Sequence, residues 1–113
     1  MTEDEFRRLV LSFPDVEEGT SYGMAGYKLR GKGFTRLRSE DDSVVLRVGF
    51  DEREMLMEAE PDTFHLTPHY QNYPSVLARL SSVDPGTVKS FLERRWRQCA
   101  PKKLLKELDV GGA

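Results

Sequence analysis

The sequence predicts an α+β fold in which a two-layer antiparallel sheet carries its helices on one face. Apolar and polar residues alternate through most of residues 25–50, whereas the flanking segments show the three-to-four-residue spacing of helices. The expected strands follow one another directly and do not alternate with long helices. This order is typical of an antiparallel sheet and argues against a doubly wound nucleotide-binding fold.

Length and composition indicate a small protein with one domain. The 113 residues (13.0 kDa) fit a single domain over residues 1–113. The single cysteine excludes an internal disulfide and any zinc site built from several cysteines. No apolar run approaches the ~18 residues of a membrane span, and the acidic residues 1–6 lack the apolar stretch of a signal peptide. We therefore expect a soluble, cytoplasmic protein that is a monomer rather than an oligomer.

The N-terminal segment predicts an amphipathic helix over residues 3–12. Thr2 and Glu5 form the pattern of a capping box, in which each side chain accepts a hydrogen bond from a free backbone N–H at the helix start. Apolar residues then recur at helical spacing until Pro14 ends the pattern. Residues 15–24 contain two glycines and several acids, and we expect them to form a loop.

Residues 25–50 predict a meander of three antiparallel strands joined by two turns. Glycines at 31 and 33 mark the first turn, and the acidic residues 40–42 mark the second. Alternation assigns one set of side chains to the core and leaves Phe34 outside. The residues expected to face the core are Ala25, Tyr27, Leu29, Leu37, Val44, Leu46, Val48 and Phe50.

Residues 51–108 predict helices around one or two further strands. Asp84 followed by Pro85 gives a strong helix start, because Asp favours the N-cap and Pro the first helical position. Asp51 and Glu54 form another capping-box pattern. The expected elements are a helix over 51–59, strands over 63–66 and 75–80 around a loop at 67–74, a helix from 85 up to Pro101, and a last helix over 102–108.

Charge is distributed unevenly along the chain. Residues 27–38 contain five basic side chains and no acidic one, whereas the remaining 12 basic and 19 acidic residues give the rest a net charge of −7. If the apolar residues of the meander face the core, its basic residues point outward together. Backbone phosphates would suit this surface, and an exposed Phe34 would stack on a base. The candidate nucleic-acid-binding residues are Lys28, Arg30, Lys32, Arg36, Arg38 and Arg47.

The same pattern has an alternative interpretation as an ordinary solvated sheet face. The acidic turn at 40–42, or the C-terminal helix, would then neutralise the basic residues. Helix-turn-helix and zinc-finger signatures are absent, and no expected helix carries base-reading side chains at one end. Any nucleic-acid binding would therefore have little sequence specificity.

The loop at 64–74, rich in aromatic residues and histidine, is a second candidate site. Such side chains suit a protein partner or a small ligand, and the residues that we assign to this site are His69, Tyr70, Tyr73 and Arg79. Metal binding is not predicted, because Pro68 disfavours the helix that would align the two histidines and Asp62 is the one nearby carboxylate.

Motifs for catalysis are absent from the sequence. There is no GxSxG, HExxH, P-loop or dinucleotide fingerprint. Cys99 lies on the apolar face of an expected helix, where a thiol is inert. We therefore expect no enzymatic activity and no cofactor.

Several short stretches occur in a fixed order along nearly the whole chain. They are Phe13–Glu18, Gly19–Gly23, Tyr27–Phe34, Pro68–Tyr70, Leu80 with Asp84-Pro85, and Trp96 with Ala100–Leu104. Together they resemble the small bacterial MmcQ/YjbR-like proteins. The resemblance implies a frataxin/CyaY-like (double-wing) fold, with a sheet packed against helices, and a DNA-binding function.

The predicted function is therefore non-catalytic binding of DNA through the outward basic face. The alternative is a protein-interaction or small-ligand module that uses the loop at 64–74. The two hypotheses differ in the residues on which they depend, since the first uses residues 28–47 and the second uses the loop.

Overall fold

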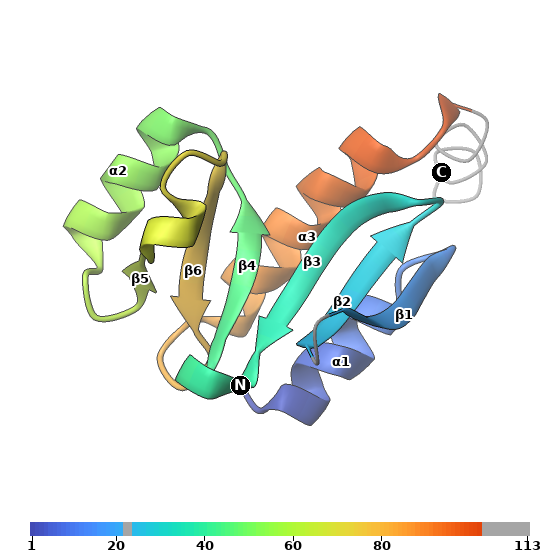
Figure 1. Cartoon of the computed structure of the whole chain (residues 1–113), viewed down its shortest axis with the longest axis horizontal. Helices are drawn as coiled ribbons and strands as arrows, with labels where there is room; N and C mark the ends of the chain where they lie inside the picture. The colour runs from blue at the N-terminus through green and yellow to red at the C-terminus, as the bar shows by residue number, and fades with distance from the viewer. Residues whose placement is uncertain (22–23, 103–113) are drawn as a thin grey trace.

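One antiparallel sheet organises the molecule (Figure 1), and the computed structural model describes residues 1–21 and 24–102. In this part of the chain six strands pair in the order β1-β2-β3-β4-β6-β5, and every neighbouring pair is antiparallel. The strands are β1 (Val16–Ser21), β2 (Met24–Leu29), β3 (Lys32–Arg38), β4 (Ser43–Arg47), β5 (Phe64–His65) and β6 (Ser75–Arg79). The helices are α1 (Glu3–Leu11), α2 (Phe50–Ala59) and α3 (Pro85–Cys99), with short 3-10 turns η1 (Ser39–Asp41) and η2 (Pro68–Tyr70). The predicted α+β class is confirmed.

Helices α1 and α3 cover one face of the sheet, and the core lies between them and the strands (Figure 1). Phe6 of α1 meets Tyr27 of β2 edge to face, with ring centroids 6.2 Å apart. Trp96 of α3 is buried, and its indole N–H donates a hydrogen bond to the Pro14 carbonyl oxygen at 2.9 Å. The inward orientation predicted for Tyr27, Leu29, Leu37, Val44, Leu46 and Val48 is confirmed by their burial.

Side-chain caps begin the two helices that pack on the sheet. Thr2 Oγ1 accepts a hydrogen bond from the Glu5 backbone N–H at 3.1 Å, and Glu5 Oε1 accepts one from the Thr2 N–H at 3.3 Å. Asp84 Oδ2 accepts from the Thr87 N–H at 3.0 Å, with Pro85 in the first turn. Both predicted caps are confirmed, and each is worth about 1 kcal/mol to its helix.

Helix α2 begins differently from the prediction. Gly49 is its N-cap and provides no side-chain bond, so the expected cap at Asp51 does not form. Strand β4 ends at Arg47, which places Phe50 in the helix and not in the sheet. Phe50 is 47% exposed, and its predicted place in the core is therefore wrong.

The loop expected at 15–24 is also wrong, because Val16–Ser21 forms the edge strand β1. Its residues pair with β2 from Val16 opposite Leu29 to Ser21 opposite Met24. Acidic residues and a glycine give this segment low strand propensity, so pairing with β2 determines its conformation.

Phe34 faces the core and not the solvent, in contrast to the prediction. Tyr27 pairs with Thr35 and Lys28 pairs with Gly33, so β3 has one extra residue at this point. Such a bulge resets the alternation of a strand. Phe34 consequently packs edge to face against Phe13, with ring centroids 5.6 Å apart, and is 3% exposed. Its burial stabilises the fold by roughly 2–3 kcal/mol, and the ring is not available to stack on a base.

The helix expected over 102–108 lies, apart from Lys102, outside the described residues. Within residues 1–21 and 24–102, the helices are too short or too polar to cross a bilayer.

Burial against the core, with the Glu18 carboxylate nearby, raises the pKa of Tyr27 to about 12. A tyrosine in an unfolded chain ionises near pH ~10. Between these values the folded protein keeps a proton that the unfolded chain releases, so the free energy of unfolding falls as the pH rises through this range. We expect Tyr27→Phe to lose less stability than the wild type between about pH 9 and pH 11, measured by urea denaturation. Equal losses in the two proteins would contradict this assignment.

Candidate functional site

Helices α1 and α3 cover one face of the sheet (Figure 1). A groove of about 550 Å³ lies on the opposite face. Its floor consists of residues from strands β1 to β4, and its wall consists of η2 and the residues that follow it. Gly26, Arg36 and Val45 are paired in register across β2, β3 and β4. Paired residues point to the same side of a sheet, so this row forms part of the floor.

Three cations from neighbouring strands line this groove, namely Lys28 of β2, Arg36 of β3 and Arg47 of β4. Lys28 and Arg47 are exposed, and Arg36 is half-buried. Within the described residues, none of the three forms an ion pair or a hydrogen bond through its side chain. Strands lie ~4.8 Å apart, so the backbones of Lys28 and Arg47 are separated by about 10 Å.

A pair of glycines provides the surface on which Arg36 lies. Gly19 and Gly26 are opposite each other on β1 and β2, and both line the groove. A Cβ atom at Gly26 would be 3.8 Å from Arg36 Nε and 3.9 Å from the Gly19 carbonyl oxygen. The Arg36 side chain therefore extends across the strands over a floor without side chains, at the side of the groove toward β1.

The groove also contains two acidic residues, but in the described structure neither forms an ion pair with its cations. Glu17 is the cross-strand neighbour of Lys28, and no ion pair joins the two in the described structure. Glu18 is bound by Arg7 of α1, with Nε to Oε2 at 2.8 Å, and this contact lowers the pKa of Glu18. Burial lowers the pKa of Arg95, and repulsion from Arg47 contributes in the same direction. The Arg95 guanidinium donates a hydrogen bond to the carbonyl oxygen of the groove residue Gly33 at 2.8 Å.

The remaining predicted cations lie outside the groove, and two of them are paired. Arg30 lies in the β2–β3 turn and forms an ion pair with Asp15, in which Nη2 is 2.7 Å from Oδ2. Arg38 pairs with Glu40 at 2.9 Å and Asp41 at 3.6 Å, so the acidic turn neutralises this arginine only. Lys32 is exposed at the start of β3. The predicted basic face is therefore reduced to Lys28, Arg36 and Arg47 in the groove.

Three aromatic residues of the second candidate site form the wall of the same groove: His69, Tyr70 and Tyr73. The His69 ring meets Tyr70 edge to face at 4.8 Å and lies beside Tyr73 at 5.9 Å with a tilt of 36°. Tyr70 is nearly buried, whereas Tyr73 is 55% exposed. Arg79, the fourth residue predicted for this site, lies at the far end of β6, opposite Ser43, and does not line the groove.

A buried arginine that the sequence analysis missed holds this wall in place. Arg53 of α2 is 5% exposed, and its Nη1 donates to the carbonyl oxygens of Tyr73 at 2.9 Å and Ser75 at 3.3 Å. Its Nη1 also approaches the backbone carbonyl oxygen of Tyr70 at 3.5 Å, and its Nη2 donates to the backbone carbonyl oxygen of Gln71 at 3.2 Å. One guanidinium thus donates hydrogen bonds to four backbone carbonyl oxygens between residues 70 and 75.

A signal for Arg53 exists in the sequence. It precedes Leu56 and Met57 by three and four residues, so it occupies a helix position where an apolar side chain would face the core. A charged residue at such a position, before an irregular segment with many free carbonyls, indicates an anchor for that segment. The groove glycines Gly19 and Gly26 carry no comparable signal, because their pairing depends on the strand that was missed.

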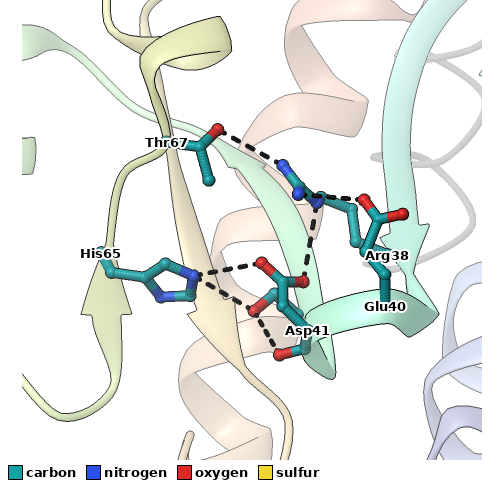
Figure 2. A network of polar contacts seen from close by, with 6 residues as sticks. Arg38, Glu40, Asp41, His65 and Thr67 are labelled. Atoms are coloured by element: carbon teal, nitrogen blue, oxygen red, sulfur yellow. Dashed lines mark hydrogen bonds and ion pairs between the residues drawn. The ribbon is translucent and has the colours of Figure 1, made fainter.

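A second polar cluster joins the β3–β4 connection to β5 (Figure 2). Asp41 Oδ2 lies 3.5 Å from His65 Nε2, and Ser43 Oγ lies 3.4 Å from the same nitrogen, while Arg38 reaches Thr67 at 3.4 Å. Ser, His and Asp resemble a nucleophile triad by type only. Both partners share Nε2, Nδ1 has no partner in the described structure, and Ser43 is fully buried.

The described residues also contain no group of three or more His, Cys, Asp or Glu side chains placed to hold a metal ion.

The fold and the groove define a class of small α+β proteins with a cation-lined groove on the open face of an antiparallel sheet. Comparison with known protein families assigns the chain to one of them. The YjbR family model matches residues 11–98, and the chain belongs to this family. The predicted resemblance to MmcQ/YjbR-like proteins is thereby confirmed.

Individual relatives are similar over part of their length. The chain is 34% identical over 79 residues to "Uncharacterized protein Rv2570" of Mycobacterium tuberculosis (strain ATCC 25618 / H37Rv). It is equally similar to "Uncharacterized protein Mb2600" of Mycobacterium bovis. The match covers 66% of this chain and 60% of each relative, so the chain spans less than two thirds of their length. No solved structure gives a significant match.

The position of Arg53 predicts a large effect of its removal. In Arg53→Met the loop carbonyls lose a charged donor inside the protein, and we expect the free energy of unfolding to fall by about 3 kcal/mol. Urea denaturation measures this change. Arg79→Met is the matched control, since Arg79 is an exposed arginine with no side-chain bond in the described structure, and its effect should stay within about 0.5 kcal/mol. Similar stabilities of the two variants would refute the anchoring role.

Proposed function

We propose that this protein binds nucleic acid, without catalysis, by placing backbone phosphates on Lys28, Arg36 and Arg47. The observation that carries the proposal is that these groove cations form no ion pair in the described structure, whereas Arg30 and Arg38 are paired with carboxylates. Like charges on neighbouring strands repel each other, whereas an anion bound among them is attracted by all three. Phosphodiesters supply such anions at regular spacing.

Groove shape and charge also support contacts with backbone phosphates rather than base-specific recognition. The cations come from sheet strands, and the groove contains no helix end that could enter a major groove. Phosphate contacts position a nucleic acid without identifying its sequence. The proposal therefore includes little sequence specificity, and it keeps the expectations of a CyaY-like arrangement and of a cytoplasmic monomer without metal or cofactor.

Salt dependence provides the direct test of this proposal. Three phosphate contacts give a slope of about −2 to −3 in log affinity against log salt, so affinity should fall roughly 20- to 40-fold between 50 and 200 mM salt. Fluorescence anisotropy with labelled single-stranded and duplex DNA measures this slope. Absence of binding by the wild type even at 50 mM salt would overturn the proposal.

The double variant Arg36→Gln/Arg47→Gln identifies the surface. Two charged contacts of about 1.5 kcal/mol each are lost, so we expect about 100-fold weaker binding and a salt slope reduced by roughly 1.4–1.8. Arg79→Gln/Lys89→Gln removes the same charge from exposed positions outside the groove and should bind within threefold of the wild type. Equal losses in the two double variants would assign the effect to net charge and not to the groove.

Small-ligand binding is a second candidate function, favoured by the groove volume of about 550 Å³. This value falls within the roughly 300–1,000 Å³ of small-molecule sites. The cations would then hold one phosphate-bearing metabolite beside the aromatic wall. Calorimetric titration with a nucleoside monophosphate and with pyrophosphate separates this function from the first, because tight binding of either compound, with no gain for an oligonucleotide, favours the small ligand.

A further inference from the structure

We infer that the nucleic acid bound in this groove is single-stranded, and that one unpaired base stacks on the Tyr73 and His69 rings. This inference rests on the proposed function and adds the form of the ligand. It depends on three observations, which are the exposure of the aromatic wall, its rigid support and its position beside the cations.

Tyr73 is a large aromatic side chain whose ring is available to a ligand. It is 55% exposed although it lines a groove, and His69 beside it is exposed as well. The two ring centroids lie 5.9 Å apart and the ring planes are tilted by 36°, so two aromatic rings stand side by side in the groove wall. A base that stacks on such a surface contributes ~1–3 kcal/mol, and every base has a face that suits it.

The loop that carries these rings is fixed before any ligand arrives. Arg53 donates to carbonyl oxygens on both sides of Tyr73, at Gln71 and at Ser75, and to that of Tyr73 itself. The backbone N–H of Tyr73 donates to the backbone carbonyl oxygen of Tyr70 at 3.1 Å, and the backbone N–H of Ser75 donates to that of Tyr73 at 2.8 Å. A surface held in this way loses little backbone freedom on binding, which preserves the stacking energy.

Strand pairing places a phosphate site next to the aromatic surface. Arg47 of β4 is directly opposite Ser75 of β6, and Ser75 is two residues from Tyr73. Beyond Arg47 the floor continues to Arg36 and Lys28 on β3 and β2. A strand lying from the wall toward β2 would thus place a base on Tyr73 and its following phosphates on the three cations.

A duplex cannot use this arrangement. Its bases are covered on both faces by their neighbours and present only their edges in the grooves. The aromatic rings stand in the side wall of a concavity whose cations lie on the floor, so a base must leave the helical stack to reach them. Both DNA and RNA single strands offer the required base faces and phosphates.

The test compares a mixed-sequence 12-mer alone and annealed to its complement, by fluorescence anisotropy at about 50 mM salt. We expect the wild type to bind the single strand at least tenfold more tightly than the duplex, and DNA and RNA versions of the strand within threefold of each other. Tyr73→Leu removes the ring and should weaken single-strand binding about 5- to 150-fold while leaving duplex binding unchanged. Tyr73→Phe, the matched control, keeps the ring and should bind within threefold of the wild type.

The outcomes distinguish this inference from the proposed function. If the duplex binds as tightly as the single strand, and Arg36→Gln/Arg47→Gln weakens both, the groove binds nucleic acid and the single-strand inference is overturned. Unchanged single-strand binding by Tyr73→Leu overturns the stacking role, provided that its circular dichroism matches the wild type. If neither form binds the wild type, the proposed function itself fails.

Discussion

The hydrogen bonds between the buried Arg53 guanidinium and the loop at 70–75 are the interaction on which the groove depends. A buried charge normally requires a carboxylate partner, and in the described structure Arg53 has none. Carbonyl dipoles replace it, and the Phe50 ring lies 4.7 Å from the guanidinium carbon. Only arginine offers several donors in a planar fork, so one side chain of α2 can fix a loop that has no regular structure of its own.

The electrostatic character of the groove results from a division among the basic residues. Arg7, Arg30, Arg38 and Arg94 have carboxylate partners. Lys28, Arg36 and Arg47 have none in the described structure, and they share one concave surface. The chain as a whole carries a net charge of −2, so its long-range field does not attract anions. Attraction is confined to short range, where the groove cations act together.

Local chemistry made part of this structure predictable. The caps at Thr2 and Asp84, and the alternation of Tyr27 with Leu29 and of Val44 with Leu46, depend on residues close in sequence. Strand β1 and the inward turn of Phe34 depend on pairing with β2, which no local pattern encodes.

The site, too, could be predicted from the sequence only where it depends on residues close in the chain. Its cations and its aromatic residues were identified as two alternative sites, whereas the pairing of Arg47 with Ser75 makes them neighbours in one groove. Arg53 was missed because its partners are backbone oxygens some 20 residues away in the chain.

The edges of the sheet also have a consequence for solubility at high concentration. An uncovered edge strand can recruit the same strand of another molecule and begin a fibre. In the described structure β5 offers only two residues, and β1 carries Glu17, whose charge repels the same residue of an identical strand.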